Sequence, residues 1–260
     1  MNRLLTLLPT FLLCTLTLSA QNFCLQAHRG LSNRYPENSV PAFVQAGKAG
    51  VYYGMETDVQ MTSDGVLVCM HDATLDRTTD HSGAVSDYTF AQLKKIRLDG
   101  GYGWSEAYAG KLKIPTFKEY LKICRRYSLV PYVELKLLTP EGVRQTVEML
   151  HDMGFEGKYV LTSFHKDYLE VAARYTDAPL EYMHRQYTPE IVDSCVGPLN
   201  FVIRPSARRM TEELVRHAVS RGFTVECYGI PVGDADLVAR LMEWGVKGGT
   251  CNDYIDIIVK

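Results

Sequence analysis

Three carboxylates lie within apolar segments of this chain, where acidic residues are uncommon. Glu56 and Asp58 are two residues apart in the segment Tyr53–Gln60, and Glu134 lies in the segment Val130–Leu135. Side chains at positions i and i+2 of a strand point to the same face, and neighbouring carboxylates repel one another unless a proton or a cation lies between them. A lone Glu-x-Asp pair is usually solvated, but three converging carboxylates indicate a hard divalent cation, Ca²⁺ or Mg²⁺, rather than Zn²⁺.

Two histidines directly follow apolar segments. His28 comes after the segment Phe23–Ala27, and His71 comes after Val66–Met70. One histidine at such a place is more often a hydrogen-bonded core residue, whereas two beside a carboxylate cluster favour general acid–base catalysis near neutral pH. Asp72 is expected either to orient an imidazole or to cap the turn.

Arg29 and Lys136 place positive charge next to these groups. A guanidinium can hold two phosphate oxygens, and an ammonium acts as a point charge. Both side chains can also pair with Glu37, Glu56 or Glu134, and the two roles are compatible. Carboxylates, imidazoles and cations together fit an anionic phosphoester better than a sugar or a peptide.

These groups need a scaffold that brings the ends of separate strands together. The eight expected strands are Phe23–Ala27, Tyr53–Gln60, Val130–Leu135, Tyr159–Thr162, Leu180–Met183, Phe201–Arg204, Thr224–Cys227 and Val246–Cys251. They alternate with helical segments, which predicts parallel strands with helical crossovers. This pattern favours a closed TIM (β/α)8 barrel, whose sites lie at the carboxyl ends of its strands, over an open doubly wound sheet.

Helix starts can also be read from the sequence. Thr116 begins a capping-box pattern, and Thr139, Thr188 and Thr211 precede proline or acidic residues. Gly245 follows a helical segment where a left-handed stop is expected.

One stretch interrupts the alternation of strands and helices. Met61–Arg77 predicts a hairpin, and Thr78–Leu112 is long, polar and rich in glycine and tyrosine. A long excursion over the mouth of a barrel is either functional, as a lid, or a surface loop with its own small cluster around Tyr102 and Trp104. We therefore expect a small insertion after the second strand, at about 61–112.

The first 20 residues have the layout of a secretory signal peptide. Arg3 gives a short positive start, Leu4–Leu18 is almost wholly apolar, and Leu18-Ser19-Ala20 offers a small-residue cleavage site. We expect removal of residues 1–20, which leaves a domain over 21–260 that is exported to the periplasm or secreted. An uncleaved N-terminal anchor is the alternative.

Without Arg3 the chain carries 27 of its 28 basic residues against 30 acidic ones, a net charge of −3. A nearly neutral chain without a long basic run argues against nucleic-acid binding. No later segment is apolar enough to span a bilayer, so no stable membrane insertion is expected after cleavage. Most of the six remaining cysteines lie in apolar stretches and read as small core residues.

The chain resembles the glycerophosphodiester phosphodiesterase family over nearly all of its length after the leader. The shared residues are His28-Arg29-Gly30, Pro36-Glu37-Asn38-Ser39, Ala42-Phe43, Glu56-x-Asp58-Val59, Thr62-x-Asp64-Gly65, His71-Asp72-x-x-Leu75-x-Arg77-Thr78-Thr79, Ile114-Pro115-Thr116, Val133-Glu134-Leu135-Lys136, Ser163-Phe164 and Gly245-Val246-x-Gly248. So many spaced matches do not arise by chance.

The resemblance implies a metal-dependent enzyme that hydrolyses glycerophosphodiesters, such as deacylated phospholipids, to glycerol 3-phosphate and an alcohol. It also implies that the substrate's own glycerol hydroxyl attacks first, giving a cyclic phosphate that water then opens. By position, it implies metal ligands at Glu56, Asp58 and Glu134, an acid–base pair at His28 and His71, phosphate contacts at Arg29 and Lys136, and supporting residues at Glu37 and Asn38.

The C-terminal third departs from the family pattern. Glu226-Cys227-Tyr228-Gly229 stands where the family usually has Trp-Thr-x-Asn, and the last strand ends in Cys251-Asn252-Asp253-Tyr254. We expect this departure to alter the pocket wall that faces the leaving alcohol. His165 and His184, also near strand ends, are interpreted as pocket-wall or surface residues.

Two alternative functions remain open. A phospholipase D-like hydrolase of lysophospholipids would need an apolar lip at the barrel mouth, for which Tyr102, Trp104 and Tyr108 are the candidates. A non-catalytic phosphodiester-binding protein would not need two histidines and three carboxylates. A glycoside hydrolase would use paired carboxylates but explains neither the histidines nor the Arg–Lys pair.

Overall fold

The computed structural model describes residues 23–199 and 201–253, so the expected leader, residues 1–20, lies outside them. The strands are β1 (Cys24–Ala27), β2 (Gly54–Met61), β3 (Leu67–Cys69), β4 (Val130–Leu135), β5 (Val160–Ser163), β6 (Leu180–Met183), β7 (Phe201–Arg204), β8 (Glu226–Ile230) and β9 (Gly248–Cys251). The α-helices are α1 (Val40–Ala49), α2 (Phe90–Leu93), α3 (Phe117–Tyr127), α4 (Pro140–Asp152), α5 (Lys166–Ala172), α6 (Pro189–Asp193), α7 (Glu212–Ser220) and α8 (Ala235–Trp244).

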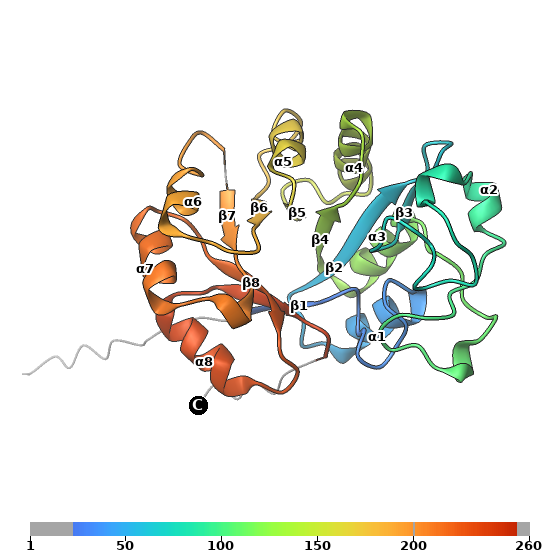
Figure 1. The fold of residues 1–260 in the computed structure, drawn as a ribbon, viewed down its shortest axis with the longest axis horizontal. Coiled ribbons are helices and arrows are strands. Elements are labelled where there is room, and N and C mark those ends of the chain that lie inside the picture. Colours follow the sequence, from blue (N-terminus) through green and yellow to red (C-terminus); the bar gives the residue numbers. More distant parts are fainter. Residues whose placement is uncertain (1–22, 200, 254–260) are drawn as a thin grey trace, which may run out of the picture.

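Eight parallel strands form a nearly closed barrel with the order β7-β6-β5-β4-β2-β1-β9-β8. Backbone contacts at its seam join β7 to β8: the Ile203 N–H donates to the Thr224 carbonyl over 3.0 Å, and the Tyr228 N–H donates to the Pro205 carbonyl over 3.1 Å. The helices lie around the outside of this ring (Figure 1). The predicted TIM (β/α)8 barrel is thus confirmed, and the open sheet is excluded.

The predicted helix starts are confirmed by their capping contacts. The hydroxyls of Thr116, Thr139, Thr188 and Thr211 each accept a hydrogen bond from a backbone N–H in the first turn of α3, α4, α6 and α7. Such bonds satisfy donors that a helix leaves unpaired at its start. Gly245 ends α8 in the left-handed conformation, with φ 112°.

Helix α3 holds strand β2 in place from outside the barrel. Its buried face carries Tyr120, whose ring packs edge-on against Phe43 of α1 at a centroid distance of 5.1 Å. The Tyr120 hydroxyl donates to the Met55 carbonyl over 2.5 Å. Because side chains alternate along a strand, burying Met55 against the helices directs Glu56 to the barrel interior.

The segment between β2 and α3 has a small core of its own. Strand β3 pairs antiparallel with β2, which gives the predicted hairpin. The buried residues of this core are Val68, Met70, Leu75, Val85, Leu93, Ile96, Leu98 and Ile114. The alternative of a small cluster around Tyr102 and Trp104 does not describe this core, since aliphatic residues form it and Tyr102 is 54% exposed.

All six cysteines in the described part of the chain are free, and five of them are buried. Among residues 23–199 and 201–253, none of the helices combines the length and the apolar character that crossing a bilayer requires.

Candidate active site

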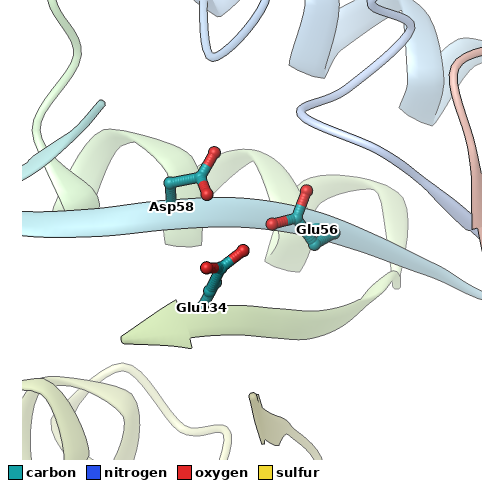
Figure 2. Close-up of side chains that lie close together, drawn as sticks. All are labelled: Glu56, Asp58 and Glu134. Atoms are coloured by element: carbon teal, nitrogen blue, oxygen red, sulfur yellow. The ribbon is translucent and has the colours of Figure 1, made fainter. Parts of the chain in front are cut away.

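The three carboxylates predicted as metal ligands meet at the carboxyl ends of two adjacent strands. Glu56 and Asp58 lie on β2, and Asp58 is directly opposite Glu134 of β4 in the parallel register. One carboxylate oxygen from each residue lies within 4.8 Å of the other two, and all three residues are buried. Figure 2 shows the three groups turned toward a common centre.

Two oxygens of this cluster lack a hydrogen-bond partner among the residues that the structure describes. They are Glu56 Oε1 and Asp58 Oδ1, both buried. Burial, and then the charges of Asp58 and Glu134, raise the pKa of Glu56 well above its usual range. Burial and the charge of Asp58 likewise raise the pKa of Glu134 to about 7. Unpaired buried oxygens and mutual repulsion are the conditions that a hard divalent cation relieves, so the donor set fits Ca²⁺ or Mg²⁺.

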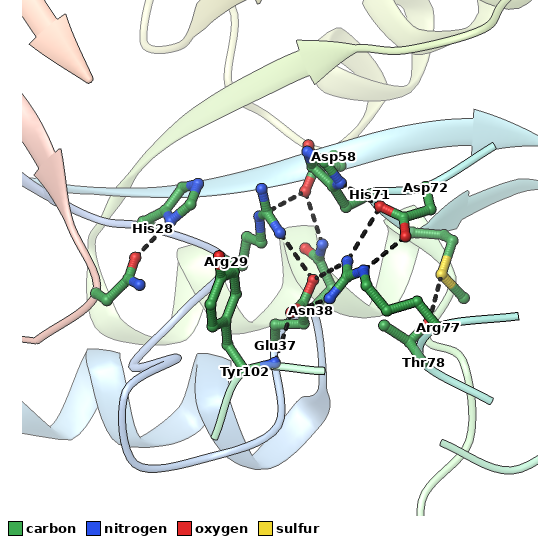
Figure 3. Close-up of polar contacts among 12 residues, drawn as sticks. His28, Arg29, Glu37, Asn38, Asp58, His71, Asp72, Arg77, Thr78 and Tyr102 are labelled. Atoms are coloured by element: carbon green, nitrogen blue, oxygen red, sulfur yellow. Dashed lines mark hydrogen bonds and ion pairs between the residues drawn. The ribbon is translucent and has the colours of Figure 1, made fainter. Parts of the chain in front are cut away.

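Arg29 and Asn38 fix the orientation of two of these carboxylates. The Arg29 backbone N–H donates to Glu56 Oε2 over 2.9 Å, and its Nε lies 3.3 Å from Asp58 Oδ2. Asn38 Nδ2 donates to the same Asp58 oxygen over 2.8 Å (Figure 3). Asn38 Oδ1 accepts from the Thr57 hydroxyl. Although burial opposes it, the Arg29 charge lowers the pKa of Asp58.

Arg29 and Asn38 both adopt the left-handed backbone conformation, with φ 56° and 51°. Residues other than glycine adopt it at a cost of about 1–3 kcal/mol, and such strain concentrates at functional sites. Here it aims the Arg29 N–H and the Asn38 amide at the carboxylates on β2. These contacts agree with the predicted supporting role of Asn38.

Glu37 joins the loop after β1 to the insertion. It accepts from Arg29 over 2.8 Å, from both terminal nitrogens of Arg77 over 2.8 and 2.9 Å, and from the Tyr102 backbone N–H over 2.7 Å. Burial opposes ionisation, but the Arg77 and Arg29 contacts lower the pKa of Glu37. A Cβ on Gly101, where φ is 88°, would lie 2.9 Å from Glu37 Oε2, so this approach requires glycine.

Lys136 lies beside the cluster on the side of β4. Its Nζ is 2.6 Å from Glu134 Oε1 and 3.8 Å from Asp58 Oδ1. Both the expected ion pairing and the position for a phosphate contact are therefore compatible with the geometry.

One ring nitrogen of His28 faces the site, and the other forms a hydrogen bond that holds the ring in place. Its Nδ1 lies 2.5 Å from Asn252 Oδ1, an acceptor, which assigns the proton to Nδ1 and leaves Nε2 as an acceptor. Burial, followed by the charge of Arg29, lowers the pKa of His28 to about 4. The imidazole is therefore neutral near pH 7. Sequence reasoning named Asn252 only as part of the last strand's divergent end and missed this contact.

A hydrogen bond at Nδ1 also holds the ring of His71 in place. Its Nδ1 lies 2.5 Å from Asp72 Oδ1, and Asp72 in turn accepts from Arg77 over 2.6 Å. The Arg77 contact, opposed by partial burial, lowers the pKa of Asp72 to about 2. Of the two expected roles for Asp72, orienting the imidazole is the one that this contact supports.

The site residues line two neighbouring cavities at the barrel mouth. A central cavity of about 200 Å³ is lined by His28, Arg29, Glu56, His71, Glu134, Thr162, Phe164, Met183, Arg204, Tyr228, Gly229 and Thr250. An outer cavity of about 360 Å³ shares His71, Glu134 and Phe164 with it and extends along β4 and β5 to His165 and Arg185. The five residues predicted for metal binding and catalysis therefore come together.

An ion cluster in the barrel interior was not predicted. Arg204 is 1% exposed and pairs with Glu181, and its terminal nitrogens also contact Glu226 over 3.4 Å and Gln26 over 3.0 Å. Tyr132 Oη lies 3.4 Å from Glu226. Glu226 belongs to the stretch of β8 that was expected to depart from the family pattern, and this stretch therefore contributes to a charged network in the barrel interior.

The Glu181→Gln variant should flatten the pH dependence of stability. Burial, and then the charge of Glu226, outweigh Arg204 and raise the pKa of Glu181 well above its usual range. The folded chain then holds a proton that the unfolded chain releases above about pH 4.3, so the free energy of unfolding falls as pH rises through the raised pKa. The amide cannot titrate, so urea titrations from about pH 5 to 8 should give a smaller fall. A slope equal to the wild type's would contradict this.

Comparisons with known proteins agree with this geometry. The pattern described as the Glycerophosphoryl diester phosphodiesterase family matches residues 28–256. A Bacillus subtilis glycerophosphodiester phosphodiesterase is 32% identical over 276 aligned positions, which cover 94% of this chain and 87% of that protein. A Caldanaerobacter subterraneus glycerophosphodiester phosphodiesterase is 38% identical over 141 residues, but the match spans 53% of this chain and 56% of that relative.

Solved structures share the fold. The glycerophosphodiester phosphodiesterase of Agrobacterium tumefaciens superposes with a TM-score of 0.73 at 20% identity, over 89% of this chain and 97% of that one. An Oleispira antarctica phosphodiesterase, solved in complex with the product sn-glycerol-3-phosphate, gives a TM-score of 0.71 at 24% identity, over 90% and 92% of the two chains.

Proposed function

This chain belongs to the glycerophosphoryl diester phosphodiesterase family, a family of phosphoric diester hydrolases, and we propose that it hydrolyses glycerophosphodiesters to glycerol 3-phosphate and an alcohol. One observation carries the proposal: three buried carboxylates, two of which have an oxygen without a partner among the described residues, meet beside the cavity that two supported histidines line. The product bound to the Oleispira antarctica phosphodiesterase is the product that we propose here.

Glu56, Asp58 and Glu134 are the proposed ligands of a divalent cation, Ca²⁺ or Mg²⁺. When bound, such an ion polarises a phosphoryl oxygen and lowers the pKa of a coordinated hydroxyl. Arg29 and Lys136 supply further positive charge for the phosphodiester at the edge of the same cluster. Glu37 and Asn38 keep Arg29 and Asp58 in these positions.

His28 and His71 are the proposed acid–base pair. Each has Nδ1 engaged by a side-chain oxygen, which leaves Nε2 available to exchange a proton with substrate. One imidazole accepts the proton of the attacking hydroxyl, and the other donates a proton to the departing alcohol. Asn252 and Asp72 orient the two rings. The partner of His28 is therefore a neutral amide, whereas the partner of His71 is an ionised carboxylate.

Removing the divalent cation should abolish turnover. A coupled assay for glycerol 3-phosphate, run with glycerophosphocholine and glycerophosphoethanolamine, measures the reaction. Release of choline from glycerophosphocholine and from lysophosphatidylcholine, whose hydrolysis leaves lysophosphatidic acid and no glycerol 3-phosphate, compares the two substrate classes. We expect release from the glycerophosphodiesters, loss in excess chelator and recovery with Ca²⁺ or Mg²⁺. Full activity in excess chelator would exclude the metal mechanism, and faster turnover of the lysophospholipid would favour the phospholipase D-like alternative.

Cation binding has a second readout that does not depend on activity. An ion that binds only the folded state raises the free energy of unfolding, by about 2.7 kcal/mol at 100 times its Kd. The wild type should therefore melt at higher temperature with Ca²⁺ or Mg²⁺, and Asp58→Asn should lose most of this response. An equal response in both proteins would place the ion elsewhere.

A further inference from the structure

The outer cavity offers space for the part of the substrate that varies. It shares the lining residues His71, Glu134 and Phe164 with the central cavity, so the two lie next to each other, and it is the larger of the two, at about 360 against 200 Å³. A group attached to a phosphate at the three carboxylates can therefore extend into it. Its far wall is formed by His165 and Arg185, from the loops after β5 and β6.

Both acids that face the outer cavity are already neutralised. Asp72 pairs with His71 and Arg77, and Glu134 pairs with Lys136. Neither carboxylate is free to repel an anionic group in this space or to attract a cationic one.

Two arginines beside this cavity have no acidic partner. Within residues 23–199 and 201–253, no carboxylate lies within ion-pair distance of the guanidinium of Arg185 or Arg209. Arg209 donates to the Arg185 carbonyl over 3.1 Å, which ties the two loops together. Exposed arginines are common, but unpaired ones beside a substrate cavity leave net positive potential there.

The charge of these arginines reaches the wall between the two cavities. Tyr228 lines the central cavity and packs edge-on against Phe164 at 5.7 Å. Burial raises the pKa of Tyr228, and the charges of Arg209 and Arg185 oppose this rise. Tyr228 belongs to the stretch of β8 that departs from the family pattern.

The formal charges at the site leave positive charge available for a second anionic group on the substrate. The site acids are Glu37, Glu56, Asp58, Asp72 and Glu134, and the site cations are Arg29, Arg77 and Lys136. With a divalent cation bound these charges cancel, and a phosphodiester adds one negative charge. Arg185 and Arg209 together bring two positive charges, so one further negative charge on the substrate is balanced.

We propose that the outer cavity binds the leaving alcohol, and that Arg185, with Arg209 behind it, favours alcohols that carry a second anionic group. The inference rests on the proposed function and adds the substrate class. The phosphodiester binds at the carboxylate cluster, and the anionic group of the alcohol lies against Arg185.

A pair of substrates that differ only in a phosphomonoester, which carries about 1.5–2 negative charges at pH 7, tests the inference. Glycerophosphoinositol and glycerophosphoinositol 4-phosphate share every other group. Because an exposed ion pair is worth about 0.2–1 kcal/mol, we expect kcat/KM to be up to about fivefold higher for the phosphorylated substrate at low salt. The preference should shrink as ionic strength rises, since salt screens exposed charges.

The variant Arg185→Gln should remove most of this preference, so that kcat/KM for the two substrates becomes nearly equal. Arg240→Gln, an exposed arginine on α8, is the matched control and should keep the preference. Competitive inhibition by inositol 4-phosphate provides a binding readout and should weaken only in the Arg185 variant.

The possible results distinguish a failure of this inference from a failure of the proposed function. Turnover of both substrates at equal kcat/KM, or a preference that survives Arg185→Gln, would overturn the inference and leave the proposed function standing. Failure of the folded, metal-supplied wild type to hydrolyse either substrate or glycerophosphocholine would overturn the proposed function and the inference with it.

Discussion

The variants His28→Ala and His71→Ala should each lower kcat by about 10²–10⁴-fold, the usual contribution of one general acid or base. Each imidazole lies in the cavity that holds the carboxylates, with its Nδ1 engaged by Asn252 or Asp72. Alanine removes the proton carrier and leaves the partner side chain in place. Steady-state kinetics with glycerophosphocholine measures the loss.

The fold should survive both histidine substitutions, because neither side chain belongs to the apolar core. Circular dichroism and urea titration check this. His184→Ala is the matched control: this rim histidine bonds only the nearby Gln186 backbone among the described residues, and its loss should leave kcat unchanged. Near-normal turnover in either the His28 or the His71 variant would remove that residue from the proposed mechanism.

The second large effect concerns stability. Arg204→Met should lower the free energy of unfolding by about 3–5 kcal/mol, the usual cost of removing one member of a buried ion pair. Methionine fills much of the same volume but leaves Glu181 and Glu226 facing one another inside the barrel without a cation. Urea denaturation of the metal-free protein measures the change.

An exposed arginine with two acidic partners gives the comparison. Arg144 pairs with Glu141 and Glu148 on the surface of α4, where such pairs contribute about 0–1 kcal/mol. Arg144→Met should therefore cost far less than Arg204→Met. Similar losses of unfolding free energy in the two variants would show that burial does not increase the contribution of the Arg204 cluster to stability.

The barrel could be predicted from the sequence because its signals are local. Each strand is a short apolar run, and each helix begins at a residue such as Thr116 or Thr139 whose cap is complete within three positions. The pairing of Glu56 and Asp58 with Glu134 followed from one topological rule, that parallel strands bring their carboxyl ends together.

Other parts of the site could not be predicted, because their partners are distant in the chain. His28 and Asn252 are 224 positions apart, and neither residue type indicates the other. Glu181, Arg204 and Glu226 each lie in an apolar strand segment, and their common position inside the barrel depends on three separate registers. The core of the insertion could not be located either, because its aliphatic residues are scattered along the segment.

The contact between Gly101 and Glu37 limits how this protein can diverge. The excursion over the barrel mouth has its own core, so most of its surface can change sequence or length without disturbing the barrel. This tolerance of change does not extend to Gly101, because the side chain of any larger residue there would collide with the Glu37 carboxylate, which positions Arg29. In a set of related sequences, this short segment should therefore vary as slowly as the metal-binding strands, although it lies in the most changeable region of the chain.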